Sequence, residues 1–270
     1  MPFTFSHPAI VLPLTKARLK LSATGLIVGS IIPDFEYFIR MTDLTRYSHT
    51  LNGIFWFDLP LALAVSFIYH LIVRNALFDN LPSFLKDRFY VYRKFDWSGY
   101  FLRNWALVLL SIVIGAASHI VWDAVTHNTM FYVTQADLTM IMKIGRINLA
   151  GYKFLQMISS IAGGLAVILS IFALRRIHQP KTKINYWYWV SVSFITVFVF
   201  FLRFSRHGFH FYYLKYHRVV GVTLIASIMI SLILTPLLLN QKQPPGAKNS
   251  LQKKKEVDTV TGSWKRSTAS

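Results

Sequence analysis

Five long apolar segments, separated by shorter polar ones, dominate the hydropathy pattern of this chain. Each is close to the ~20 residues that an α-helix needs to cross the hydrocarbon core of a bilayer. Five such segments exceed what the core of one small soluble domain can cover. The pattern therefore predicts an all-α, multi-pass integral membrane protein with spans near residues 51–73, 105–126, 154–174, 186–204 and 218–239.

A sixth apolar segment, residues 21–33, is too short to cross a bilayer. It predicts a re-entrant or interfacial helix that ends at Pro33 and Asp34. Gly25 and Gly29 lie four residues apart within it. Such a pair of small residues indicates that the segment packs closely against another helix.

The polar segments between the spans carry weaker signals. Residues 81–89 predict a short amphipathic helix on the membrane surface, and residues 127–153 form a connector without a clear motif. We expect residues 1–239 to form a single membrane domain. Residues 240–270 predict a disordered basic tail that contacts anionic lipid.

Composition supports the membrane class. The chain has 270 residues, of which 54% are hydrophobic and 15% charged, whereas about a quarter of the residues in a soluble domain are charged. The net charge is +18. Because the basic residues lie at the ends of the apolar segments and in the tail, they indicate membrane anchoring and argue against nucleic acid. The absence of cysteine excludes disulfides and thiolate metal ligands.

The distribution of Lys and Arg also bears on orientation. With the N-terminus outside, the inner segments carry 17 basic residues and the outer segments 12. This bias favours an external N-terminus and a cytoplasmic tail.

The sequence SHIVWDAVTH at 118–127 is the strongest candidate for chemistry. His119, Asp123 and His127 recur every four residues near the end of the second span, so they lie along one face of a helix. Two imidazoles and a carboxylate on one face suit a metal ion. Ionisable residues within a bilayer are costly and therefore indicate function, although helix–helix hydrogen bonds without a metal are the alternative.

Connectivity brings further polar residues to the same side of the membrane. The first two spans form a hairpin, so His49, just before the first, and His127, just after the second, face one side. His7 and Asp34 precede His49 without an intervening span and lie there too. The sequence therefore predicts that these imidazoles and carboxylates converge.

Asp58 lies at a similar predicted depth to His119, because each is eight or nine residues from the same membrane face. Metal-bound imidazoles usually donate their second nitrogen to a carboxylate, and Asp58 is the candidate acceptor for His119. Alternatively, Asp58 caps the break before Pro60 or faces polar atoms of another helix.

The connection between the fourth and fifth spans is rich in histidine, arginine and aromatic residues. An interfacial aromatic belt accounts for this composition. The alternative is a basic lip that binds an anionic headgroup, formed by Arg203, Arg206 and His210.

Four motifs in the first half of the chain resemble a known pattern: FTFSHP at 3–8, GSIIPDFEYF at 29–38, SHTLNG at 48–53 and SHIVWDAVTH at 118–127. Together they resemble the domain-of-unknown-function 4184 family of bacterial membrane proteins. That family is similar in motif order to inner-membrane metal-dependent hydrolases under LexA control, and more distantly to zinc-dependent phospholipases C.

The resemblance implies a divalent metal site, with zinc as the first choice, in a bacterial inner (plasma) membrane. The implied ligands are His7, Asp34, His49, His119, Asp123 and His127. A metal-bound water would attack a phosphodiester, Asp34 or Glu36 would take a proton, and Arg203 or Arg206 would steady the phosphate. The further His-x-x-x-Glu pair of the phospholipases is absent, so one or two ions are expected here.

The leading functional hypothesis is therefore a metal-dependent hydrolase that acts on phospholipid-like phosphoesters at the membrane interface. Two alternatives remain open. One is a non-enzymatic membrane protein in which the cluster is a structural metal site or a hydrogen-bonded staple. The other is a proton- or ion-coupled transporter with His119, Asp123 and Asp58 as its relay.

Overall fold

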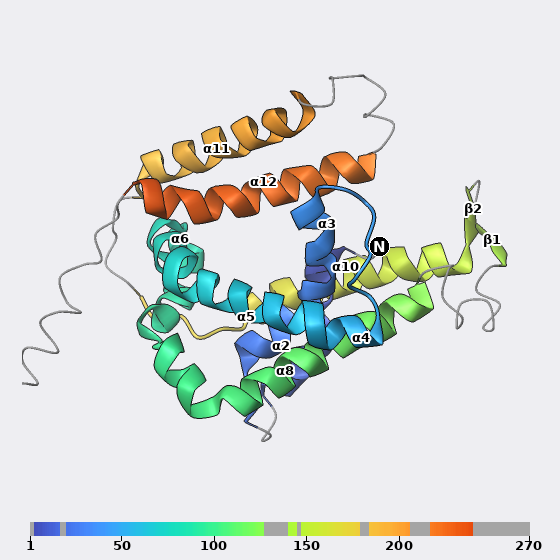
Figure 1. The fold of residues 1–270 in the computed structure, drawn as a ribbon, viewed down its shortest axis with the longest axis horizontal. Coiled ribbons are helices and arrows are strands. Elements are labelled where there is room, and N and C mark those ends of the chain that lie inside the picture. Colours follow the sequence, from blue (N-terminus) through green and yellow to red (C-terminus); the bar gives the residue numbers. More distant parts are fainter. Residues whose placement is uncertain are drawn as a thin grey trace, which may run out of the picture.

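The structure, a computed structural model, is built almost entirely of helices (Figure 1). It describes residues 3–16, 20–126, 140–144, 147–178, 184–205 and 217–239. Among these described residues, five helices are long and apolar enough to cross a membrane, which confirms the predicted fold class. They are Leu51–Asn80, α8 (Trp97–Thr126), α10 (Gly151–Phe172), α11 (Tyr186–Ser205) and α12 (His217–Leu238).

The first long helix is a composite of α-helical and wider π-helical turns. Its parts are α4 (Leu51–Gly53), η3 (Ile54–Asp58), α5 (Leu59–Ile68), η4 (Tyr69–Val73) and α6 (Arg74–Asn80). Pro60 follows η3 and has no N–H with which to continue the α-helical ladder. The π-helical turn before it relieves this mismatch, and such turns are frequent at functional sites.

The second long helix begins earlier than predicted. α8 starts at Trp97, and Asn104 within it has non-helical backbone angles (φ −132°, ψ 25°). The predicted span began at 105, directly after this kink. Between the first two long helices lie α7 (Ser83–Phe89), where a short helix was expected, and η5 (Tyr90–Lys94).

The N-terminal segment packs inside the bundle. It comprises η1 (Thr4–Ser6), α1 (Pro8–Thr15), α2 (Ala23–Ile31), η2 (Ile32–Asp34) and α3 (Phe35–Arg40). Ser22 caps α2 by accepting a hydrogen bond from the Gly25 N–H, 3.2 Å away. Met41, with a left-handed φ of 50°, ends α3. The predicted short helix of residues 21–33 is therefore present and closely followed by two more turns.

Glycines bring α2 and α8 into backbone contact. A Cβ on Gly29 would lie 2.9 Å from Ile112 Cα, and one on Gly115 would lie 2.7 Å from the Ser30 nitrogen. Gly25 likewise faces Ser111 of α8. The predicted close packing of Gly25 and Gly29 is thus confirmed, and α8 is the partner.

A small hairpin follows the second long helix, in a segment where no motif was predicted. β1 (Ile141–Ile144) pairs with β2 (Ile147–Ala150) in antiparallel register, with Ile141 opposite Ala150. The third long helix, α10, begins at Gly151, directly after β2. The predicted tail, residues 240–270, lies outside the described residues.

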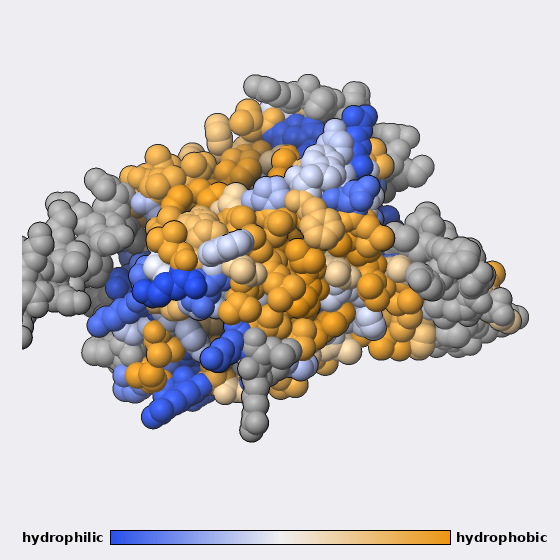
Figure 2. Space-filling model, turned by 60° about the horizontal axis from the view of Figure 1, so that its bottom comes forward, coloured by the Kyte–Doolittle hydropathy of each residue, from blue (hydrophilic) through white to orange (hydrophobic). Residues whose placement is uncertain are grey.

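The apolar core lies between α2, α3, the first long helix, α8 and α12. The outer faces of the long helices are also apolar, and Figure 2 shows a broad hydrophobic surface with hydrophilic residues towards its margins. Exposed side chains such as Ile161, Leu169 and Phe194 contribute to this exterior. An apolar exterior of this extent fits helices that face lipid.

Candidate metal centre

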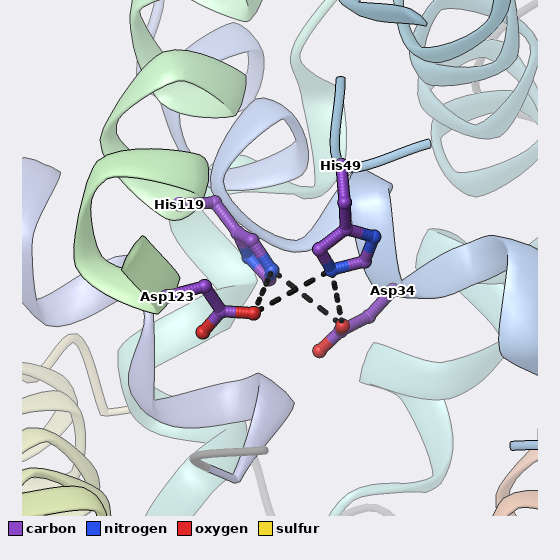
Figure 3. A group of neighbouring side chains, drawn as sticks. All are labelled: Asp34, His49, His119 and Asp123. Carbon is purple, nitrogen blue, oxygen red and sulfur yellow. Dashed lines mark ion pairs between the residues drawn. The ribbon is translucent and has the colours of Figure 1, made fainter. Parts of the chain in front are cut away.

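Four side chains from three separate regions of the chain converge at one end of α8. Asp34 ends η2, His49 lies in the loop before α4, and His119 and Asp123 lie one turn apart on α8. Figure 3 shows them pointing toward a common centre. One ligand atom from each residue lies within 4.8 Å of all the others. The structure therefore brings together four of the six predicted ligands.

The two imidazoles alternate with the two carboxylates around this centre. His49 Nε2 lies 3.4 Å from Asp34 Oδ1 and 3.5 Å from Asp123 Oδ2. His119 Nε2 lies 3.5 Å and 3.6 Å from the same two oxygens. These separations are long for hydrogen bonds. They are close to the ~3.4 Å between ligand atoms that surround a zinc ion tetrahedrally at about 2.1 Å.

The group is almost entirely withdrawn from solvent. The Asp34, His119 and Asp123 side chains are 1%, 0% and 3% exposed, and that of His49 is 11% exposed. Within the described residues, Asp34 Oδ1, His49 Nε2 and His119 Nε2 have no hydrogen-bond partner. Buried polar atoms of native proteins usually have one, and a group of this kind could hold a metal ion.

Neighbouring groups hold three of these side chains in place. His119 Nδ1 lies 2.8 Å from the Ser30 carbonyl oxygen, which can only accept, so Nδ1 carries a proton and, in the neutral imidazole, Nε2 keeps its lone pair. Thr4 Oγ1 donates to Asp34 Oδ2 at 2.5 Å. His49 Nδ1 lies 3.0 Å from Ser48 Oγ. Such supporting contacts fix the orientation of ligands toward a metal.

His7 lies beside the four residues. Its ring stacks on His119 with centroids 3.8 Å apart, and its Nε2 is 3.7 Å from Asp123 Oδ1. Neither ring nitrogen has a hydrogen-bond partner among the described residues. Burial, reinforced by His119, lowers the pKa of His7 to about 4 although Asp123 and Asp34 oppose the shift. A neutral His7 thus keeps a lone pair for a metal.

The charge of Asp34 suits the same role. Burial acts to raise the pKa of Asp34, but the imidazoles of His119 and His49 outweigh it and hold the pKa below its ordinary value. Asp34 is therefore an anionic ligand at neutral pH. The sixth predicted ligand, His127, lies outside the described residues.

The structure differs from the sequence-based assignment at Asp58. This carboxyl group is fully buried at the end of η3, and neither oxygen has a hydrogen-bond partner among the described residues. The Ser30 carbonyl takes the place that we predicted for Asp58 beside His119. A backbone carbonyl can accept the hydrogen bond from a metal-binding imidazole as well as a carboxylate can. No sequence pattern indicates which carbonyl will do so.

Glu36, a predicted proton acceptor, instead holds the chain before His49. Its oxygens accept hydrogen bonds from the backbone N–H groups of Arg46, Tyr47 and Ser48, and from the Arg40 side chain. Burial acts to raise the pKa of Glu36, but these N–H donors lower it to about 2. A carboxylate so fully occupied is a poor general base.

The predicted anion-binding residues do not join the group in the described structure. Arg203 lies near the end of α11, which packs on α12, and no contact joins it to the four described ligands. Arg206 and His210 lie outside the described residues. Thr4, Ser30 and Ser48 were not predicted, although all three lie within the quoted motifs and Ser48 directly precedes His49.

Fold and site together define a class: a multi-pass helical protein with a buried His/Asp group that could hold a metal ion. Comparison with family models gives the particular family. The model described as Domain of unknown function (DUF4184) matches residues 1–238, so the chain belongs to this family. No curated protein and no solved structure matches it. The further resemblance to hydrolases stays a hypothesis.

Proposed function

We propose that this protein is a metal-dependent hydrolase of the membrane interface that acts on phospholipid-like phosphoesters. The observation that carries the proposal is the ring of two imidazole Nε2 atoms and two carboxylate oxygens, buried and 3.4–3.6 Å apart. Two anionic carboxylates that face the same buried centre repel one another. A divalent cation at the centre would neutralise this arrangement.

Zinc suits these ligands best. Imidazole nitrogens and carboxylate oxygens bind zinc at about 2.0–2.2 Å, and the four nitrogen–oxygen separations here are near those of a tetrahedral set. Structural zinc sites are typically rich in cysteine, whereas catalytic ones use histidine and carboxylates. Because the chain contains no cysteine, its ligand chemistry favours a catalytic role.

Two features of the group support hydrolysis: the number of ligand atoms that it offers and its position near the ends of two long helices. His7 places an additional buried imidazole beside Asp123, so the group offers more ligand atoms than one tetrahedral ion needs. His49 lies two residues before the start of the first long helix and Asp123 is near the end of α8, which fits a site at a membrane face. A divalent metal there would supply a water whose pKa is lowered towards neutrality. A lipid headgroup is the substrate class nearest to such a site.

We further propose that the site faces the outside of the bacterial inner membrane and that the basic tail is cytoplasmic, because the inner segments carry more Lys and Arg. The chain lacks cysteine, so single cysteines can report orientation. Leu44, exposed near the site, is replaced by cysteine in one variant and Tyr92, between the first two long helices, in another. An impermeant maleimide should label Leu44→Cys in intact cells and spare Tyr92→Cys; the reverse pattern would invert the topology.

A structural metal centre is the second candidate, and one observation favours it. Three of the four side chains are at most 3% exposed, as in closed structural sites where all ligands come from the protein. In that case the ion would join η2, the loop at His49 and α8 without turnover.

The test begins with metal analysis of the full chain purified in detergent, with His119→Ala and Asp123→Ala as variants and His178→Ala as the matched control. His178 is 87% exposed and pairs with Asp87 away from the cluster. We expect about one or two bound ions in the wild type and control, and loss of metal in both site variants. Equal metal content in all four proteins would refute the metal centre.

Hydrolysis is tested separately with a chromogenic phosphodiester and with phospholipid vesicles. We expect turnover that requires zinc and that His119→Ala abolishes. Metal binding without turnover on either substrate, combined with a large metal-dependent rise in the unfolding temperature, would support the structural candidate and overturn the hydrolase.

A further inference from the structure

The carboxylate of Glu36 accepts five hydrogen bonds. Oε1 accepts from Arg40 Nε at 2.8 Å and from the Arg46 N–H at 2.9 Å. Oε2 accepts from the Tyr47 N–H at 3.0 Å, the Ser48 N–H at 2.9 Å and the Ser48 hydroxyl at 2.9 Å. The side chain is 2% exposed, so water does not compete for these bonds.

The same contacts hold the backbone in an unusual conformation. Three consecutive N–H groups point at one carboxylate, and the next residue, His49, has a left-handed φ of 60°. A residue with a Cβ adopts this region only at a steric cost. Such conformations persist where the surroundings impose them, and they concentrate at functional sites. The clamp by Glu36 is the local cause that the structure offers for the turn of His49.

The hydrogen bonds also determine where the protons lie. A carboxylate can only accept, so the Ser48 hydroxyl must give its single proton to Glu36. The Ser48 oxygen is then left as the acceptor for His49 Nδ1, 3.0 Å away. The proton of a neutral His49 therefore resides on Nδ1. Its Nε2 carries the lone pair and faces Asp34 and Asp123.

We propose that Glu36 is a positioning residue that acts through Ser48: it fixes the tautomer and the orientation of His49, so that Nε2 is presented as a metal ligand. This inference rests on the proposed metal centre for its consequence, but the tautomer itself does not depend on metal. Glu36 and Ser48 thereby do for His49 what the Ser30 carbonyl does for His119. Loss of such a supporting contact commonly lowers metal affinity about 10- to 100-fold.

The experiment compares the removal of two hydroxyl groups on either side of His49. Ser48→Ala removes the acceptor of His49 Nδ1. Thr50→Ala is the matched control, because Thr50 Oγ1 accepts from the Gly53 N–H and donates to the Tyr47 carbonyl without touching the imidazole. Ser48→Thr restores a hydroxyl at the same position and serves as the rescue.

Two measurements are made on the full chain in detergent micelles. Zinc affinity is measured by competition with a chromogenic chelator. The tautomer of His49 is read from the ¹⁵N shifts of its ring nitrogens in metal-free protein, with His49→Gln used to assign the signals. We expect Ser48→Ala to bind zinc at least about tenfold more weakly and to lose the predominance of the Nδ1–H form. Thr50→Ala and Ser48→Thr should resemble the wild type in both respects.

The outcomes separate this inference from the metal centre. If wild-type protein binds no zinc, the metal centre fails, while a tautomer shift confined to Ser48→Ala still supports the role of Glu36 and Ser48. If the wild type binds zinc and Ser48→Ala retains both the affinity and the Nδ1–H form, the inference is overturned. If Ser48→Ala and Thr50→Ala lose zinc affinity equally and the tautomer does not change, both residues act only by stabilising the loop. That result would also overturn the inference.

Discussion

Replacement of Gly29 by alanine should damage the metal centre although Gly29 is not a ligand. Gly29 lies on α2, where this helix crosses α8 at backbone contact distance. An added Cβ would lie 2.9 Å from Ile112 Cα and 3.0 Å from its carbonyl carbon, and closer still to its carbonyl oxygen. These atoms belong to the α8 backbone, so no side-chain rotation can relieve the overlap.

The size of the effect follows from these distances. Carbon atoms in ordinary contact are about 3.5–4.0 Å apart, so the two helices must separate by about 1 Å. α2 leads into η2 with Asp34 and carries Ser30, whereas α8 carries His119 and Asp123. A metal site tolerates departures of about 0.2 Å from ideal ligand distances. The separation therefore exceeds that tolerance about fivefold.

The assay measures zinc affinity and thermal unfolding of the purified chain with and without zinc. For Gly29→Ala we expect at least a tenfold loss of zinc affinity and a loss of stability of about 1–3 kcal/mol from overpacking. Gly221→Ala on α12 is the matched control, because its Cβ would meet no atom within 4 Å. Alanine there should stabilise the helix by about 0.5–1 kcal/mol and leave zinc affinity unchanged.

Wild-type zinc affinity in Gly29→Ala would refute this reasoning, because it would mean that the α2–α8 crossing does not set the ligand distances. A loss of stability with zinc affinity retained would lead to the same conclusion.

Three further predictions concern the surroundings of the site. Chelation of the metal should lower the unfolding temperature and added zinc should restore it, with about 2.7 kcal/mol of stabilisation when free zinc is 100 times Kd. An unfolding temperature that changes with neither the chelator nor zinc would contradict the metal centre. Thr4→Val removes the hydroxyl that donates to Asp34 Oδ2, a bond to a charged group worth about 1.5–3 kcal/mol, so chelator competition should show about tenfold weaker zinc binding; unchanged affinity would count against Thr4. Arg74→Met deletes a buried guanidinium that donates to the Phe95 and Arg93 carbonyls, and should lower stability by about 2–3 kcal/mol. Zinc affinity should not change, because Arg74 is about 35 Å along the first long helix from His49; a coupled loss of zinc would show that the two ends communicate.

Several features of the site could be predicted because they are local. His119 and Asp123 are one helical turn apart, so their shared face follows from helix geometry alone. The four-residue spacing of Gly25 and Gly29 likewise indicates a close contact between helices. Knowing on which side of the membrane each segment lies extended the prediction to residues far apart in sequence, because a chain that has not crossed the membrane must remain on one face. That argument grouped Asp34 and His49 with α8.

Other assignments failed where a side chain has more than one available partner. Glu36 lies two residues after Asp34, and its carboxylate was free to serve as a base or as a clamp. The choice depends on the path of residues 46–48, which a sequence pattern does not reveal. Asp58 was predicted at the right depth for His119, but the Ser30 carbonyl occupies the position. Backbone carbonyls are identical at every residue, so their use as acceptors leaves no signature in composition.

The amino-acid sequence by itself determined the membrane-spanning class, the number of long helices and the residues able to bind a metal, because hydropathy and helical periodicity act over one or two turns. The tertiary structure alone decided which of those residues meet and which of their atoms face the centre. That decision rests on the glycine-mediated approach of α2 to α8 and on the Glu36 clamp, contacts between segments whose strength depends on ångström-scale fit rather than on residue type.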